Sequence, residues 1–289
     1  MPAREADRGT LYVVATPIGN LGDVTMRALE TLRSVPLIAA EDTRITRRLL
    51  ARYEIATRAI SYHARSGPSR QDELLAHLRG GADLALVSDA GTPAVSDPGG
   101  ELVAAWAREG GRVVPIPGAS AVLAAVSASG VAGPRWSFEG FLPRSGRERK
   151  ERLARLAADD RATVIFEAPT RLAATLRDLA TACRADRAAA VCRELTKLHE
   201  QIERGTLAEL AAAVAAGSIP ARGEVVLVIA GRDASAEPGA RGEAQPARAS
   251  IEDGRSRVQA LVDEGLPRSE AARRVASETG LSRRDLYRR

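Results

Sequence analysis

Residues 84–100, LALVSDAGTPAVSDPGG, bring carboxylates, hydroxyls and glycines together in a pattern that suits ligand binding. The apolar run 84–87 predicts a buried parallel strand, and a loop punctuated by glycine and proline follows it. Gly91 and Gly99 let the backbone approach a bound molecule closely, and the two prolines between them stiffen the path. Ligands of open α/β sheets bind just past the carboxyl ends of strands. Because an ordinary βα connection is shorter, we interpret this one as a ligand-binding loop.

Other residues that often carry chemistry show no comparable spacing. Cys183 and Cys192 form no CxxC pair and no zinc spacing with the three histidines, so we expect reduced thiols and no metal. After the apolar run 10–16 the chain holds only Gly19 and Gly22. The G-x-G-x-x-G sequence of dinucleotide-binding folds is missing there, which disfavours a Rossmann nucleotide site.

The loop needs a sheet to position it, and apolar runs predict one. Before residue 118 we expect strands over 10–16, 36–40, 58–61, 84–87 and 112–117. Helical patterns lie between them, such as TMRALETLRS at 25–34, so the strands should form a mostly parallel sheet with helices on its faces. A second set of strands is expected over 163–169, 188–195 and 223–231. The last of these is apolar on both faces, which is typical of the middle of a sheet.

We therefore predict two α/β domains, 1–118 and 119–232, although one domain with appendages remains possible. Residues 233–249 have no periodicity and are rich in Ala, Gly and Pro, which predicts a linker. Residues 250–289 read as short helices around a turn, similar to a helix-turn-helix. From 248 onwards the chain carries ten arginines and seven acids. The alternative is a small helical cap that packs on its own protein.

Composition narrows the class of protein. The chain of 289 residues is 45% hydrophobic and 27% charged, as expected for a globular protein, and no apolar run suffices for a membrane span. The polar start predicts no secretory signal, so we expect a cytoplasmic location. The net charge of +5 suits an anionic partner. Arginine dominates the positive charge, which favours phosphate contacts or reflects genome composition.

Seven segments together resemble the tetrapyrrole methylase fold family: LYVVATPIGNLGD, AAEDTR, SDAGTPAVSDPG, PIPGASA, FEGFLPR, RELTKLHE and GEVVLVI. Within that family they are most similar to the ribosomal RNA small subunit methyltransferase I group. The resemblance covers about residues 10–231, and the tail resembles the helix-turn-helix extension of the same group. Each segment is weak alone, but their number and order make the match specific.

The resemblance implies a class III methyltransferase with S-adenosylmethionine bound in a cleft between two α/β domains, in a homodimer. The implied reaction is methyl transfer to the 2′-hydroxyl of a cytidine in the decoding region of 16S rRNA, on the small ribosomal subunit. The positions that match the cofactor-binding motifs are Pro17, Ile18, Asp89, Gly91, Thr92, Val95, Ser96, Ser120, Ala121 and the end of the strand GEVVLVIAG. Asp89 could instead anchor its loop, and Ser120 could cap a helix.

Catalysis by such an enzyme rests largely on holding the hydroxyl against the methyl carbon. A ribose hydroxyl is a poor nucleophile, so a general base or a nearby cation would help. Asp42 and Lys197 are the candidates, because each follows an apolar strand toward the implied cleft. Alternatively, Asp42 caps a helix that starts at Arg44, and Lys197 pairs with a neighbouring glutamate.

Recognition of rRNA would depend on shape and phosphate contacts. The predicted phosphate contacts are Arg144, Arg147, Arg149, Arg283 and Arg284. The alternative for these arginines is a solvated charged surface. Two other functions stay open: a methylase of a corrin or porphyrin precursor, and a regulator without catalytic activity that binds nucleic acid through the tail.

Overall fold

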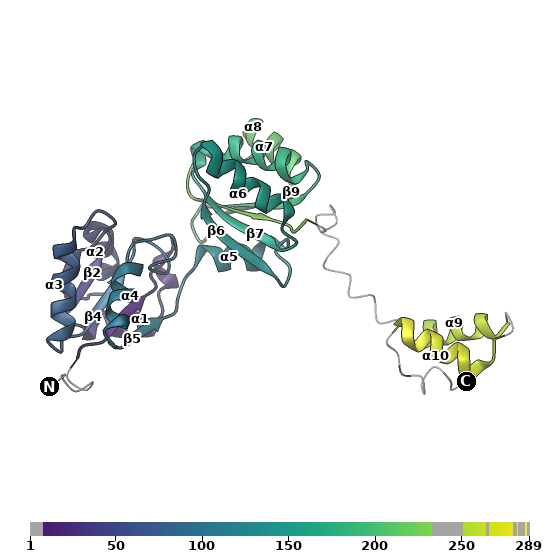
Figure 1. The fold of residues 1–289 in the computed structure, drawn as a ribbon, viewed down its shortest axis with the longest axis horizontal. Coiled ribbons are helices and arrows are strands. Elements are labelled where there is room, and N and C mark those ends of the chain that lie inside the picture. Colours follow the sequence, from purple (N-terminus) through teal and green to yellow (C-terminus); the bar gives the residue numbers. More distant parts are fainter. Residues whose placement is uncertain (1–7, 233–250, 264–265, 280–281, 283–286, 288–289) are drawn as a thin grey trace. The chain divides into compact units, whose positions relative to one another are not determined.

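The computed structural model describes residues 8–232, 251–263, 266–279, 282 and 287 of the chain. The chain divides into two compact units, Met1–Pro238 and Gly239–Arg289. Each is described here by itself (Figure 1).

The first unit begins with a sheet of five parallel strands in the order β3-β2-β4-β1-β5. Its strands are β1 (Leu11–Val14), β2 (Leu37–Ala40), β3 (Ala59–Ser61), β4 (Leu84–Val87) and β5 (Val113–Ile116). Its helices are α1 (Met26–Ser34), α2 (Thr43–Arg52), α3 (Pro68–Arg79) and α4 (Gly100–Arg108), and a short 3₁₀ turn, η2 (Leu21–Asp23), precedes α1. The strands are parallel and helices connect them, which confirms the predicted parallel sheet with helices on its faces.

Strand β4 shows why helices cover both faces of this sheet. Its alternating side chains divide between two apolar clusters, since Leu84 and Leu86 pack with α3 and α4, whereas Ala85 and Val87 pack with α1 and α2. All four residues are buried. A strand that is buried on both sides leaves its functional chemistry to the loop at its carboxyl end.

The second sheet of the same unit is mixed, in the order β6-β7-β10-β8-β9. Its strands are β6 (Trp136–Phe141), β7 (Ala162–Glu167), β8 (Ala188–Arg193), β9 (Gln201–Thr206) and β10 (Val225–Ile229). Only β6 and β7 pair in parallel, and the other three pairs are antiparallel. Strand β10 lies in the middle, as its two apolar faces predicted.

Helices cover the two faces of this sheet unequally (Figure 1). Helices α6 (Gly146–Ala158), α7 (Leu172–Cys183) and α8 (Leu207–Ala215) share one apolar cluster with the sheet. On the other face α5 (Ala121–Ser129) contributes Val122 and Ala125 to a second cluster. This cluster also contains Ile18, from the loop after β1. The first sheet's loop thus packs into the core beside the second sheet.

The second unit contains α9 (Ile251–Asp263) and α10 (Arg268–Thr279). They pack against each other around Val258, Ala271, Ala272 and Val275, and the sequence predicted two helices at these positions. The further helix expected from Ser282 onwards falls largely outside the described residues.

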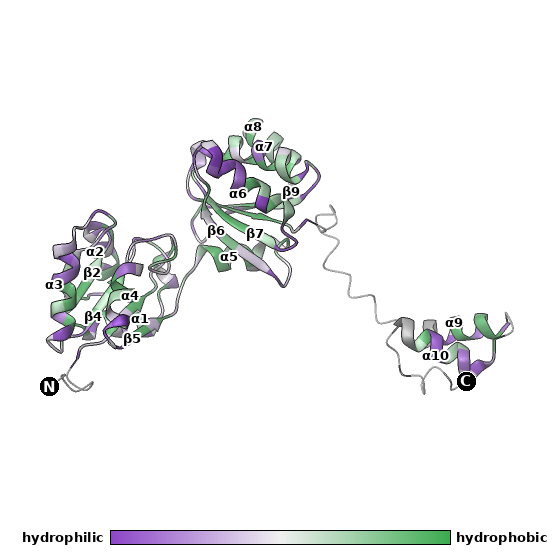
Figure 2. Cartoon of the chain, in the orientation of Figure 1, coloured by the Kyte–Doolittle hydropathy of each residue, from purple (hydrophilic) through white to green (hydrophobic). Residues whose placement is uncertain are grey.

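Hydropathy follows this layering, with apolar strands inside and polar helix surfaces outside (Figure 2). Within the described part of the chain, no helix is long and apolar enough to cross a membrane.

Candidate functional site

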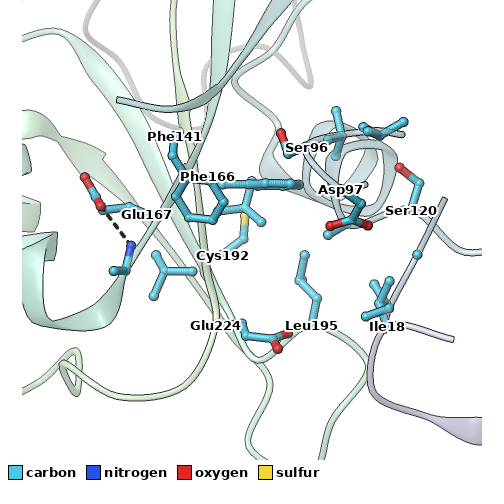
Figure 3. Close-up of a pocket in the computed structure, with 18 of the residues that line it drawn as sticks. Ile18, Ser96, Asp97, Ser120, Phe141, Phe166, Glu167, Cys192, Leu195 and Glu224 are labelled. Atoms are coloured by element: carbon cyan, nitrogen blue, oxygen red, sulfur yellow. Dashed lines mark hydrogen bonds between the residues drawn. The ribbon is translucent and has the colours of Figure 1, made fainter. Parts of the chain in front are cut away.

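A cavity of about 380 Å³ lies where loops of the first sheet meet strands of the second. The first sheet contributes Ile18 and the segment 90–97, and the start of α5 contributes Ser120–Val122. The second sheet contributes the ends of β6, β7 and β8 and the start of β10. Figure 3 shows Ile18, Ser96, Asp97 and Ser120 grouped on one side, with Phe141, Phe166 and Glu167 on the other.

Backbone hydrogen bonds fix the loop after β4 on its cavity side. The N–H of Thr16 donates to the carbonyl of Gly91 at 2.8 Å, and the N–H of Gly91 donates back at 3.0 Å. Gly91 has φ of +76°, and the non-glycine residues Ala94 and Ser96 have φ of +66° and +64°. Backbone in this region is costly for a residue with a Cβ and persists where the surroundings impose it. The loop is therefore held in one shape before any ligand binds.

The opposite wall combines aromatic rings with a buried carboxylate. Phe166 lies edge-on to Phe138 at 4.9 Å and to Phe141 at 5.6 Å between ring centroids. The Glu167 side chain has no exposed surface and pairs with Arg171 at 3.2 Å. Its oxygens also accept hydrogen bonds from the Ala168 N–H and the Thr175 hydroxyl. Glu167 is thus a fixed negative wall with its partners already in place.

Arg149, predicted as a phosphate contact, is part of the support for that wall. The residue is 7% exposed. Its guanidinium donates to Asp178 at 2.7 and 2.9 Å, to the Pro143 carbonyl at 2.9 Å and to Thr175 at 3.0 Å. Thr175 in turn donates to Glu167. The phosphate role is wrong for Arg149, because its donors are buried against their partners and cannot reach an RNA backbone.

The other predicted phosphate contacts differ from Arg149 in exposure. Arg144 is exposed, and the Arg147 side chain is 92% exposed beside Glu151, one turn further along α6. Arg283 and Arg284 lie outside the described residues. Contact of any of these arginines with RNA stays a prediction.

Asp42 is the helix cap that the sequence left as the alternative. It precedes α2, which begins at Thr43, and its carboxylate accepts from the Arg44 N–H at 2.8 Å and from the Arg44 guanidinium. These hydrogen bonds lower the pKa of Asp42 to about 2. Asp42 does not line the cavity. The prediction that Asp42 is a catalytic base is therefore wrong. A carboxylate with a low pKa that is held by arginine is a poor proton acceptor.

Asp89 anchors the two loops that follow β2 and β4. Its carboxylate accepts from the Asp42 N–H at 2.9 Å, and its own N–H donates to the Glu41 carboxylate at 3.3 Å. Burial raises the pKa of both Asp89 and Glu41. Neither Asp89 nor Pro17 lines the cavity, so the alternative role of Asp89 as a loop anchor fits the structure.

The remaining predicted cofactor positions do meet in one place. Those that line the cavity are Ile18, Gly91, Thr92, Val95, Ser96, Ser120 and Ala121. Ser120 also caps α5, since its hydroxyl accepts from the Leu123 N–H at 3.4 Å. The strand GEVVLVIAG contributes its beginning, 223–226, rather than its end. The expected contribution from the end of this strand is wrong. Because β10 runs antiparallel to β7 and β8, its beginning lies beside their ends.

Lys197 sits between the two sheets, beside the cavity rather than in its lining. Its ammonium pairs with Glu194 at 2.8 Å and with Glu224, a cavity residue, at 3.1 Å. Burial lowers its pKa, but the hydrogen bonds to the two carboxylates outweigh burial and raise it overall. A Cβ on Gly19 would lie 2.4 Å from the Lys197 Cγ. Lys197 is therefore a fixed cation against which the loop after β1 packs closely.

Sequence reasoning missed the aromatic and acidic part of the site. Phe141, Phe166, Glu167 and Glu224 all line the cavity. Phe166 and Glu167 stand together in the segment FEAPTRL. An acidic residue next to an aromatic at the end of an apolar strand is the one signal that could have drawn attention to it.

Comparison with known proteins places this geometry in a family. Residues 10–211 match the family described as Tetrapyrrole (Corrin/Porphyrin) Methylases. Residues 248–289 match the family described as RsmI C-terminal HTH domain. A relative from Synechocystis sp. named ribosomal RNA small subunit methyltransferase I is 50% identical over 96% of this chain and 96% of its own length. The chain belongs to this family of methyltransferases.

Relatives of the same name from distant bacteria agree. The protein from Vibrio cholerae is 41% identical over 96% of this chain and 92% of its own length. That from Halalkalibacterium halodurans is 40% identical over 97% of this chain and 94% of its own.

Solved structures with lower identity share the fold of the family. A cobalt precorrin-4 methyltransferase has a TM-score of 0.61 and 19% identity, covering 80% of this chain and 98% of its own. A uroporphyrin-III C-methyltransferase from Thermus thermophilus, solved with S-adenosyl homocysteine, has a TM-score of 0.56 and 20% identity. It covers 77% of this chain and 97% of its own.

Proposed function

We propose that this chain transfers a methyl group from S-adenosylmethionine to the 2′-hydroxyl of a cytidine in 16S rRNA. The observation that carries the proposal is 50% identity, over 96% of both chains, to a protein named ribosomal RNA small subunit methyltransferase I. Similarity on that scale covers both sheets and the tail. The sequence match therefore includes the cavity and the second unit at once.

The cavity fits the methyl donor in size and in chemistry. Its volume of about 380 Å³ lies within the range of small-molecule sites, roughly 300–1,000 Å³. Apolar side chains dominate, and a few hydroxyls, carboxylates and backbone groups from Gly91, Thr92 and Ser120 could orient adenine and amino acid. The Asp97 carboxylate in the lining suits a ligand that carries positive charge, whereas Glu167 and Glu224 already pair with Arg171 and Lys197.

When bound, the donor supplies an electrophilic methyl group on a sulfonium, and the chain's own residues hold and shield it. The loop segment 90–97 forms one side of the cavity, and Phe141 and Phe166 form an apolar surface on the other. Lys197, which pairs with Glu194 and Glu224 beside the cavity, is the candidate cation for making a nearby hydroxyl more acidic. The proton of that hydroxyl leaves to solvent as the new bond from oxygen to the methyl carbon replaces the bond from sulfur. Cys192 takes no part as a nucleophile, because burial raises the pKa of its thiol to about 11.

Partners follow from the same proposal. The small ribosomal subunit carries the substrate, and the exposed arginines Arg144 and Arg147, with Arg283 and Arg284 of the tail, contact its phosphates. A cytoplasmic location follows from that substrate, and a homodimer is the assembly that the family resemblance implies. Each of these can be examined separately from the reaction.

The deciding experiment is to incubate the protein with small ribosomal subunits and labelled S-adenosylmethionine and to map 2′-O-methylation on 16S rRNA. We expect label at one cytidine of the decoding region. Uroporphyrinogen III and a cobalt-precorrin serve as competing substrates in parallel reactions. Label in a tetrapyrrole and none in rRNA would contradict the proposal and assign the protein to the methylases of corrin or porphyrin precursors. Donor binding without any transfer would favour a regulator.

A further inference from the structure

A second cavity, of about 700 Å³, opens at the carboxyl edge of the first sheet. Three segments line it: the loop that follows β3, the first turns of α3, and the segment 97–101 that leads into α4. The side chains that give it chemical character are Tyr62, His63, Gln71, Asp72, Asp97 and Glu101. Its volume lies within the range of small-molecule sites, about 300–1,000 Å³.

Asp97 belongs to both cavities. The same loop lines the first cavity over 90–97 and the second over 97–101, so Asp97 stands at the changeover. Burial raises the pKa of the Asp97 carboxyl, and the neighbouring Asp89 adds to the increase while a hydrogen bond with Ser88 opposes it. The two cavities therefore adjoin at Asp97.

The charge of the second cavity selects its occupant. It has three carboxylates, from Asp72, Asp97 and Glu101, and among the described residues that line it there is no lysine or arginine. A phosphate would be repelled there, whereas groups that donate hydrogen bonds would be attracted. The lining therefore favours an occupant that carries no negative charge and presents amino or hydroxyl groups.

His63 is one of the hydrogen-bond donors that accompany these acceptors. The His63 Nδ1 accepts a hydrogen bond from the Arg65 N–H at 3.1 Å, which assigns the ring proton to Nε2 in the neutral tautomer. His63 is exposed and lines the cavity. It can donate to a carbonyl oxygen of the occupant. Arg65, exposed in the same turn, offers a cation for a phosphate that flanks the occupant.

We propose that the second cavity binds the nucleoside that is to be methylated, with the base among Asp72, Glu101 and His63 and the ribose against Asp97. The proposal rests on the proposed function and names the site where that function takes its substrate. Cytosine suits the lining because its exocyclic amino group donates to carboxylates and its O2 accepts from a donor. Uracil presents an oxygen in place of the amino group and would face negative charge. A nucleotide turned out of its stack is also the form in which enzymes reach a single nucleotide.

The test measures the affinities of the intact chain for cytidine, 2′-deoxycytidine and uridine by ligand-observed NMR. We expect the wild-type protein to bind cytidine about tenfold more tightly than uridine, the effect of one charge-assisted hydrogen bond. Glu101→Gln and Asp72→Asn should each reduce that preference. The wild type should also bind cytidine more tightly than 2′-deoxycytidine, because the ribose lies against Asp97. Asp97→Asn should remove that difference.

A matched control comes from the same helix as Asp72. Glu73 is the next residue, is exposed, pairs with Arg70 at 2.5 Å and does not line the cavity, so Glu73→Gln should leave all three affinities unchanged. Calorimetry with S-adenosylmethionine checks the fold of the Asp72, Glu73 and Glu101 variants. Circular dichroism checks Asp97→Asn, because Asp97 also lines the first cavity. Because Asp72 and Glu101 are exposed and outside the first cavity, their variants should bind the donor as the wild type does.

The outcomes separate this proposal from the proposed function. If small subunits are methylated but Glu101→Gln and Asp72→Asn discriminate the nucleosides like Glu73→Gln, the nucleoside binds elsewhere and the second cavity is not its site. The same conclusion follows if the wild type binds no cytidine at millimolar concentration. If the variants behave as expected and no rRNA is labelled, the proposed reaction fails while the nucleoside site stands.

Discussion

The two sheets of the first unit contribute to the site in opposite ways. The parallel sheet contributes loops, in which Gly91, Ala94 and Ser96 adopt positive φ and polar groups face two cavities. The mixed sheet contributes a wall whose polar groups are paired with one another, from Arg149 through Thr175 to Glu167. The difference teaches that the loops shaped around the cavities and the paired side chains behind the wall come from different parts of the chain. Changes in the loops should affect binding first, and changes behind the wall should affect stability first.

The largest expected effect is on the support of the wall. Arg149→Met leaves Thr175, Asp178 and the Pro143 carbonyl without their donor, which should lower the free energy of unfolding by about 2–3 kcal/mol. Arg147→Met on the same helix is the control, because that side chain is exposed and should change stability by no more than about 0.5 kcal/mol. Urea denaturation measures both. Equal effects of the two variants would contradict the assignment of Arg149 to the interior.

An intermediate effect is expected in the loop. Gly91 and Gly110 have nearly the same φ, +76° and +75°, but Gly91 lines the first cavity, whereas Gly110 lines neither of the two cavities described above. Gly91→Ala and Gly110→Ala should each cost about 1–2 kcal/mol of stability, because a Cβ is disfavoured at that φ. Only Gly91→Ala should also weaken binding of S-adenosylmethionine, as measured by calorimetry. Unchanged affinity in Gly91→Ala would break the assignment of ligand contacts to this loop.

The smallest expected effect concerns Asp42. Its pKa is lowered from 3.8 to about 2 by Arg44, so the carboxylate stabilises the fold above pH 4 and this contribution disappears as the pH falls toward 2. The difference in Tm between wild type and Asp42→Asn should therefore shrink over that interval. Asparagine still caps a helix, so Asp42→Ala should have a lower Tm than Asp42→Asn at every pH. If Asp42→Asn lost turnover with an unchanged Tm, the role of Asp42 as a catalytic base would be supported after all.

Much of the fold could be predicted from local patterns. Apolar runs predicted the positions of β1, β2, β4 and β10, because buried strands are apolar. The helical patterns between the first three of these strands predicted that the first sheet is parallel. Strands β6 and β9 escaped prediction. Both lie at the edges of their sheet. An edge strand has one solvated side and can carry polar residues, as the sequence QIERGT of β9 does. Their existence depends on pairing with neighbours rather than on their own composition.

The site divides along the same line. Gly91, Thr92 and Ser96 could be chosen because they belong to one unusual loop, and a loop is visible in a sequence. Glu224 could not, because it reaches the cavity only through the pairing of β10 with β7 and β8. Arg149 looked like its exposed neighbours in the segment GRERKER until the packing of α6 against α7 placed it beside Asp178.

By itself, the sequence determined most of the strands and helices, where the loop that lines the cavity lies, and the family to which the chain belongs. Each of these depends on residues that are close together in the chain or on the order of short motifs. Only the tertiary structure decided which charges are buried and paired and which face a cavity. The physical reason is that the cost of burying a charge depends on partners brought from distant positions, and no local pattern records them.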